Sequence, residues 1–261
     1  MEEKRQFPRI SVVIPALNEA PNLRHVLPLI PWSVHEIILV DGYSTDDTVT
    51  LIEQLRSTIR APIHIIMQTG KGKGNALRTG LAASTGDIIV TLDADGSADP
   101  REMPLFVEVL NMGNDFAKGS RCILGGDSYD FTLLRRLGNY GLRMLVNMLF
   151  RARFSDLCYG YNAFWKYCLD YIEIDCDGFE VETLIHLRAH KAHLRIAEVP
   201  SVEYRRIYGK SNLRAFSDGW RVLRTIVKER SKNFSPPLQS RNRKNLYIIT
   251  DPSLIPEEII L

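Results

Sequence analysis

The sequence predicts an α/β fold in which one domain is built around a mostly parallel central sheet flanked by helices. Four short apolar segments, at residues 9–15, 36–41, 62–67 and 88–91, have the composition of buried strands. They recur at intervals of roughly 20 to 30 residues and are separated by helix-type sequence. This alternation is typical of parallel βαβ units. At 261 residues, the chain is long enough for one large domain of this kind.

Polar sequence follows the first two strands. The first strand ends at Pro15, and the polar residues after it are Asn18, Glu19 and Asn22. The second strand ends in Asp41 and runs into a loop rich in Ser, Thr and Asp. In that loop, Ser44 and Asp47 are candidate N-caps for a helix over residues 49–57.

The third strand leads into Gly70-Lys-Gly-Lys-Gly-Asn75 and then into helical sequence over residues 76–83. This segment lacks G-x-x-x-x-G-K-[ST], and it does not follow the first strand as a dinucleotide fingerprint should. We therefore interpret it as a flexible basic loop. Further along, apolar periodicity predicts helices over residues 133–148, 179–189 and 212–231.

Two carboxylates, Asp93 and Asp95, follow the fourth strand directly. Residues i and i+2 of a strand share a face, so both side chains can point the same way. Ligands of parallel sheets bind outside the carboxyl ends of the strands, where all four loops are expected to meet. Mg²⁺ usually takes one or two protein carboxylates together with substrate phosphates. The pair therefore predicts a metal–diphosphate site; the alternative is a capped turn over residues 96–100.

Composition excludes several classes of protein. A net charge of +2, without zinc-finger spacing or an aromatic–basic repeat, gives no reason to expect a nucleic-acid partner. The four cysteines contain no C-x-x-C pair, so we expect reduced thiols and a cytoplasmic protein. No segment has the apolar length of a signal peptide or a spanning helix, so any membrane contact is expected to be peripheral, on the inner face.

Five motifs, in this order, resemble the family 2 glycosyltransferases of the GT-A fold: I-P-A-L-N-E, V-D-G-Y-S-T-D-D-T, G-K-G-N-A-L-R-T-G, D-A-D-G-S and K-G-S-R. Within that family the chain looks most similar to the dolichol-phosphate mannosyltransferase and polyprenyl-phosphate glycosyltransferase branch. The resemblance covers roughly residues 9–230. It implies a GT-A domain at 9–232, with a nucleotide-binding half at 9–100 and an acceptor half at 101–232. Residues 1–8 and 233–261 are then tails.

The resemblance implies a donor site at the following positions: Pro15, Ala16, Asn18, Glu19, Asp41, Lys71, Lys73, Asp93, Ala94, Asp95 and Lys210. Asp41 would contact the nucleobase or ribose, although relatives usually carry a second Asp where this chain has Gly42. Asp95 would be the stronger metal ligand, while Asp93 would hold the ribose or a metal-bound water. Lys71 or Lys73 would counter the charge of the diphosphate.

On the acceptor side, the resemblance implies that Arg121, Arg135 and Arg136 hold an acceptor phosphate. Alternatively, Arg135 and Arg136 form only the polar face of an amphipathic helix. A hydroxyl acceptor requires a general base, for which Asp156, Glu180 and Glu182 are candidates, whereas a phosphate acceptor is already ionised. The catalytic candidates are therefore Asp95, Arg121, Asp156 and Glu180. The loop over 204–213, with Lys210, is similar to one that closes over the diphosphate.

The expected activity is an inverting, Mg²⁺- or Mn²⁺-dependent transfer of a sugar from a UDP-hexose or GDP-mannose to a polyprenyl phosphate. The first alternative is the same chemistry on the hydroxyl of a soluble small molecule or glycan. Two other classes stay open, a sugar-nucleotide pyrophosphorylase and a non-catalytic nucleotide-binding protein. A pyrophosphorylase would carry a Gly-rich, Arg-containing loop after its first strand, and the intact Asp pair counts against a non-catalytic protein. The sequence leaves the oligomeric state open.

Overall fold

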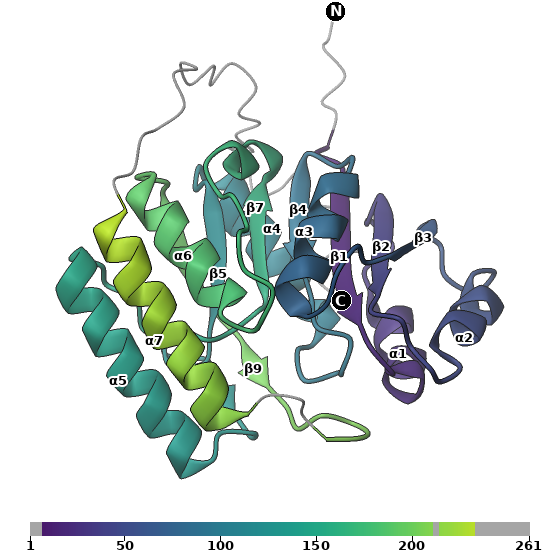
Figure 1. Cartoon of the computed structure of the whole chain (residues 1–261). Helices are drawn as coiled ribbons and strands as arrows, with labels where there is room; N and C mark the ends of the chain where they lie inside the picture. The colour runs from purple at the N-terminus through teal and green to yellow at the C-terminus, as the bar shows by residue number, and fades with distance from the viewer. Residues whose placement is uncertain (1–6, 211–213, 233–261) are drawn as a thin grey trace, which may run out of the picture.

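A computed structural model describes residues 7–210 and 214–232 of the chain (Figure 1). The strands are β1 (Ile10–Ala16), β2 (Glu36–Asp41), β3 (Ile63–Met67), β4 (Ile88–Thr91), β5 (Phe116–Ser120), β6 (Asp127–Ser128), β7 (Asn162–Trp165), β8 (Ile196–Pro200) and β9 (Val202–Glu203). The α-helices are α1 (Ala20–Val26), α2 (Thr48–Leu55), α3 (Lys73–Ala83), α4 (Met103–Asn111), α5 (Leu133–Phe150), α6 (Val181–Lys191) and α7 (Ala215–Ser231). The expected tail at 233–261 lies outside the described residues.

The central sheet has seven strands in the order β3-β2-β1-β4-β7-β5-β8. All neighbouring pairs are parallel except the two that β7 makes with β4 and β5. A second, two-stranded sheet joins β6 to β9. The prediction of a mostly parallel sheet with helices between its strands is therefore confirmed, and the four expected strands are β1 to β4.

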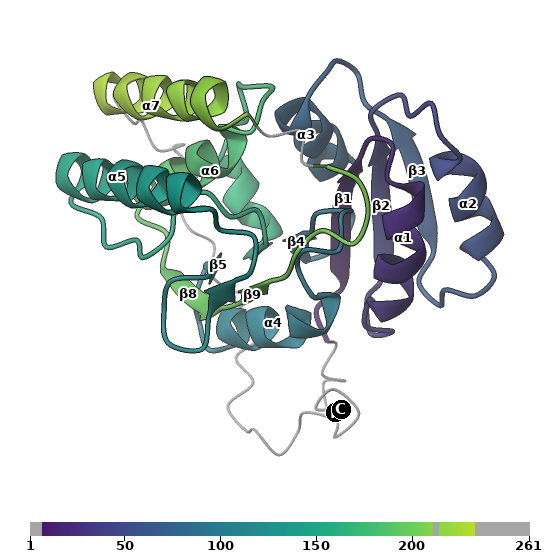
Figure 2. The same ribbon diagram turned by 90° about the horizontal axis from the view of Figure 1, so that it is seen from below.

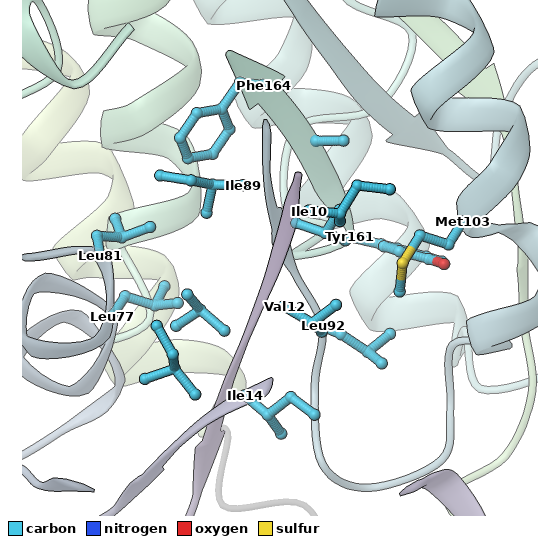
Figure 3. Close-up of a cluster of buried hydrophobic side chains, with 14 of the residues drawn as sticks. Ile10, Val12, Ile14, Leu77, Leu81, Ile89, Leu92, Met103, Tyr161 and Phe164 are labelled. Carbon is cyan, nitrogen blue, oxygen red and sulfur yellow. The ribbon is translucent and has the colours of Figure 1, made fainter. Parts of the chain in front are cut away.

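The core lies on both faces of this sheet. Val12 and Ile14 of β1 are fully buried. Figure 3 shows β1 running between Leu77 and Leu81 of α3 on one side and Met103 of α4 on the other. A smaller cluster, formed by Val146, Leu157, Leu187, Val222 and Ile226, joins α5, α6 and α7. Among the described residues, no helix is both long and apolar enough to cross a membrane.

Of the two expected caps of α2, Asp47 is the N-cap residue, although its side chain makes no capping hydrogen bond. The first N–H of the helix, that of Thr48, donates instead to Oδ1 of Asp46 at 3.0 Å. Ser44 does not cap the helix. Ser44 is engaged elsewhere, because its Oγ accepts from the backbone N–H of Asn18 at 2.9 Å. That bond ties the loop after β2 to the loop after β1.

The basic glycine-rich segment is not wholly a flexible loop, because α3 begins at Lys73 rather than at residue 76. Its first turn packs on the backbone around Asp177: Gly74 N donates to Asp177 O at 2.9 Å. Gly72 has a φ of +89°, and a Cβ there would lie 2.2 Å from Asp177 O. Only glycine fits this approach, so the segment is fixed by a contact distant in sequence.

Candidate active site

The loops after β1 and β2 are joined at the carboxyl edge of the sheet. Asn18 has a φ of 56°, and its Oδ1 accepts from the backbone N–H of Thr45 at 2.7 Å. Gly42 N donates to Ala16 O at 2.8 Å. These bonds hold Ala16 and Asn18, two of the expected donor-site residues, against the loop that follows β2.

Asp41 is the last residue of β2, and only one of the two oxygens of its buried carboxylate accepts a hydrogen bond from the described residues. Its Oδ2 accepts from the backbone N–H of Ser44 at 2.9 Å. Its Oδ1 is buried and has no hydrogen-bond partner among the described residues. Buried polar atoms are nearly always paired, so this oxygen is an acceptor available to a ligand N–H.

Lys73 joins two carboxylates that are far apart in the sequence. Its Nζ lies 2.6 Å from Asp93 Oδ1 and 2.6 Å from Glu182 Oε1. Burial by itself would lower the pKa of Lys73, but the charges of Asp93 and Glu182 outweigh it and raise that pKa. Lys73 therefore stays charged. A Cβ at Gly160 would lie 2.9 Å from both Lys73 Nζ and Glu182 Oε1, so this cluster is closely packed.

A loop over residues 204–210, called the strap below, crosses the same edge. Tyr204 N donates to Ser97 O at 2.7 Å, and Ile207 N donates to Asp95 O at 3.3 Å. The strap therefore follows the backbone that carries Asp95. At its far end, Tyr208 N donates to Asn22 Oδ1 at 2.8 Å.

Arg206 of the strap lies between two acids of the expected donor site. Its Nη2 donates to Glu19 Oε1 at 2.5 Å and lies 3.5 Å from Asp95 Oδ2. Glu19 also accepts from Asn22 Nδ2 at 2.5 Å. Burial raises the pKa of Glu19, and the hydrogen bond from Asn22 and the charge of Arg206 offset this only in part. Glu19 is thus an internal partner of the strap.

The carboxylate oxygens at this edge suit a hard divalent cation that takes its other ligands from a substrate. Asp93 and Asp95 offer carboxylate oxygens, with side chains 33% and 24% exposed. No group of three or more His, Cys, Asp or Glu placed to hold a metal occurs within residues 7–210 and 214–232. A cation here would need further oxygen ligands, which a diphosphate and water can supply.

Arg121 and Asp156 form a buried ion pair. Arg121 Nε and Nη2 donate to the two Asp156 oxygens at 2.7 and 2.9 Å, and Arg121 Nη1 donates to Glu203 at 3.0 Å. Asn139 Nδ2 also donates to Asp156, at 3.0 Å. Burial alone would raise the pKa of Asp156, but the hydrogen bonds and charge of Arg121 outweigh it and lower that pKa.

These contacts indicate a structural role for Arg121 and Asp156. Asp156 is fully buried, and both of its oxygens already accept hydrogen bonds. It is poorly placed to take a proton from an acceptor hydroxyl. The guanidinium of Arg121 is likewise committed to Asp156, Glu203 and the carbonyl of Cys158.

The remaining expected residues differ in their exposure to solvent. Lys71, Lys210 and Arg136 are exposed, and Arg135 pairs with Asp130. Glu180 stands at the N-terminus of α6, where its Oε1 accepts from Gly178 N at 3.3 Å. Its Oε2 is buried without a hydrogen-bond partner among the described residues. Ala94 is buried and contributes backbone only.

Sequence reasoning missed Glu203 and the pairing of Arg206 with Glu19. Glu203 belongs to the two-residue strand β9, which is too short to give a period. Arg206 and Glu19 are 187 residues apart. The available signal was the basic, glycine-containing composition of residues 204–210, which indicates a loop near acids but not which acids.

Comparison with known proteins identifies the family of this chain. The family model described as glycosyl transferase family 2 matches residues 11–170. A dolichol-phosphate mannosyltransferase of Pyrococcus furiosus is 28% identical over 214 residues, which are 79% of this chain and 59% of that protein. An uncharacterized glycosyltransferase of Mycobacterium bovis is 29% identical over 223 residues, 82% of this chain and 97% of that one.

A solved structure is similar as well. Glucosyl-3-phosphoglycerate synthase from Mycobacterium tuberculosis, in complex with Mn²⁺, UDP-glucose and phosphoglyceric acid, superposes with a TM-score of 0.69 at 25% identity. The superposition covers 88% of this chain and 82% of the synthase. The family model, the sheet order and the superposition agree: the chain belongs to glycosyl transferase family 2, has the GT-A fold and is a glycosyltransferase.

Proposed function

We propose that this chain transfers a sugar from a nucleoside diphosphate sugar to a polyprenyl phosphate, with inversion and with Mg²⁺ or Mn²⁺. The observation that carries the donor half is that Asp41, Asp93 and Asp95 follow strands whose carboxyl ends lie at the same edge of the sheet, on either side of β1. In support, the similar synthase was solved with Mn²⁺ and UDP-glucose. Asp95 would help to hold the cation, which would supply charge neutralisation for a diphosphate leaving group.

The chain's own residues supply the rest of the donor site. The free Oδ1 of Asp41 can accept the imino N–H of a base, which uracil and guanine both carry. Lys73 holds Asp93 in place, leaving Asp95 as the principal metal ligand. Arg206 and Lys210 lie on the strap, and both can donate to diphosphate oxygens once Arg206 leaves Glu19.

The acceptor half is supported by the likeness to a dolichol-phosphate mannosyltransferase and by the commitment of Asp156, one of the candidate bases, to an ion pair. Asp156 is locked to Arg121, whereas an ionised phosphate attacks without a base. Arg136 is exposed at the start of α5, next to Arg135. This pair is our choice for holding the acceptor phosphate.

A second candidate is a soluble acceptor with a hydroxyl, as the phosphoglyceric acid bound to the similar synthase suggests. In that case Glu180, with its unpaired buried oxygen, is the remaining candidate base. The two candidates share a donor site and differ only in the acceptor.

One assay separates them. A thermal-shift screen of UDP- and GDP-sugars with Mn²⁺ first identifies the donor. The labelled donor is then incubated with a short polyprenyl phosphate or with phosphoglyceric acid. We expect a lipid-linked sugar. If only the soluble acid is glycosylated, the acceptor assignment is wrong, and if no donor stabilises the protein, the donor assignment is wrong too.

A further inference from the structure

The outer surface of α5 and α7 carries large apolar side chains exposed to solvent. Their exposed fractions range from 53% at Met144 to 82% at Phe216. The main members are Leu133, Leu137, Met144 and Met148 on α5, and Phe216 and Trp220 on α7. Positions spaced by four and seven residues lie on one side of a helix, so each helix presents a continuous stripe. We call these two stripes the α5/α7 face.

The two helices lie side by side at the outside of the molecule. Figure 1 and Figure 2 both show α5 next to α7, and the two helices are in contact. On their inner side, Val146, Val222 and Ile226 are buried together. The core is thus complete without the stripes, which fill no gap within the described part of the chain.

The charges around this face are mainly basic. Two acids border it: Asp130, directly before α5, pairs with Arg135, and Asp175 pairs with Lys228. Residues 131–155 contain five arginines and no Asp or Glu. The two acids of α7, Asp218 and Glu229, are 7% and 2% exposed, and both face inward. The exposed charged residues of α7 are basic: Arg221, Arg224, Lys228 and Arg230. The face is therefore apolar with a basic rim, although the whole chain carries only +2.

The face is continuous with the edge of the site. Tyr129, four residues before α5, stacks on Tyr204 of the strap with ring centroids 5.8 Å apart. Tyr129 N also donates to Glu203 O at 2.8 Å. The strap itself leads toward α7, which begins at Ala215. Both helices therefore begin close to the strap that crosses the candidate site.

We propose that the α5/α7 face docks on the surface of an anionic lipid bilayer, with the start of α5 and the strap turned toward the headgroups. A helix with an apolar stripe and a basic polar face lies in the interface of anionic membranes. Trp and Tyr favour that interface, and arginine can extend its charged end to phosphates while its stem covers apolar surface. Two copies of the face in contact would bring basic rims together. An anionic bilayer complements them.

Vesicle flotation tests this directly. The full chain is mixed with vesicles of phosphatidylcholine, or of phosphatidylcholine with phosphatidylglycerol, all without polyprenyl phosphate. We expect binding only with phosphatidylglycerol, weakened at least tenfold in Trp220→Gln/Met148→Gln. Replacing Arg221, Arg224 or Lys228 by Gln should each weaken binding roughly fivefold.

The matched control is Trp32→Gln/Met112→Gln. It removes the same two types of side chain, 51% and 69% exposed, from a different surface. It should bind like the wild type, and both variants should keep the wild-type melting temperature. The proposal is overturned if the wild type does not float, if the control loses binding equally, or if sedimentation shows a dimer that Trp220→Gln dissociates. Membrane docking rests on the proposed function, because it would bring the site close to a lipid acceptor. These vesicles contain no polyprenyl phosphate, so the docking proposal and the acceptor proposal are tested separately.

Discussion

Lys73 Nζ lies 2.6 Å from Asp93 Oδ1, although the two residues are 20 positions apart in the sequence. The same nitrogen lies 2.6 Å from Glu182 Oε1. Asp93 thus shares a lysine with Glu182, whereas the cation nearest to Asp95 is Arg206, at 3.5 Å. The two aspartates of this short motif therefore have different surroundings, and they should respond differently to mutation.

Lys73→Met should destabilise the fold. It leaves Asp93 and Glu182 close together without their shared cation, and breaking such a buried pair costs about 3 kcal/mol or more. Urea denaturation gives the free energy of unfolding. Lys71→Met, at an exposed lysine two residues away, is the control and should change it little. Adding Glu182→Gln to Lys73→Met should recover part of the loss; no recovery would contradict the account of this cluster.

Asp95→Asn should abolish metal-dependent donor binding and leave the fold intact, because Asp95 has no buried lysine partner to lose. Asp93→Asn should weaken donor binding less and also lower stability, because it removes a partner of Lys73. Calorimetry with the identified nucleoside diphosphate and Mn²⁺ measures the affinity. Unchanged affinity in a folded Asp95→Asn protein would refute its role as the principal ligand.

The sequence predicted strands β1 to β4 and their parallel arrangement because the signals for these elements are local in the sequence. β2 and β4 coincide with the expected ranges, and the polar loops after β1, β2 and β4 meet as the carboxyl-edge argument requires. The pairing of Lys73 with Glu182 could not be read in the same way. The two residues are 109 positions apart, and both are of types that usually lie on surfaces.

The same limit explains the roles expected for Arg121 and Asp156. An arginine and an aspartate in polar sequence are compatible with two interpretations. They can be a phosphate-binding residue and a general base, or they can be the two members of a buried ion pair. The structure places Arg121 against Asp156 and Glu203, the latter 82 residues away. Only the chain topology, which sets β5 and β9 near each other, decides between these readings.

Asp156→Asn should cost roughly 3–5 kcal/mol of unfolding free energy near pH 7. The pKa of Asp156 is lowered in the folded state, whereas an unfolded Asp titrates near about 3.9. The pair's contribution is therefore complete above about pH 5 and is lost as the pH falls below that. The difference between wild type and variant should shrink from pH 5 to pH 3. A constant difference would contradict this; Asp177→Asn, at an exposed pair with Arg78, is the control.

Arg206→Gln should raise the affinity for Mn²⁺ in the absence of nucleotide and lower the affinity for the nucleoside diphosphate. The guanidinium lies 3.5 Å from Asp95 and competes with a cation for it. Exposed pairs contribute up to about 1 kcal/mol, and these side chains are only 18% and 24% exposed, so the gain in Mn²⁺ affinity should be at least roughly fivefold. Electron paramagnetic resonance titration measures free Mn²⁺. Arg205→Gln is the neighbouring control, and equal effects in both variants would refute the specific role of Arg206.

The last prediction concerns the acceptor. If Arg135 and Arg136 hold a lipid phosphate, replacing either by Ala removes a charged hydrogen bond that typically contributes about 1.5–3 kcal/mol. Use of the acceptor should then fall by roughly 10- to 150-fold, with donor affinity nearly unchanged. Arg121→Ala should differ, because its loss leaves Asp156 buried without a partner and lowers the melting temperature.

Initial rates with labelled donor and varied polyprenyl phosphate measure the effect. Arg56→Ala, at the residue that follows α2, is the control for a lost surface arginine. A hydroxyl acceptor gives another pattern. Glu180→Gln would then abolish transfer to the hydroxyl acceptor, whereas Arg135→Ala and Arg136→Ala would retain that transfer. The polyprenyl phosphate would not be glycosylated by any of these proteins. The phosphate assignment fails if that pattern is found, because an ionised acceptor requires the arginines and has no use for a base.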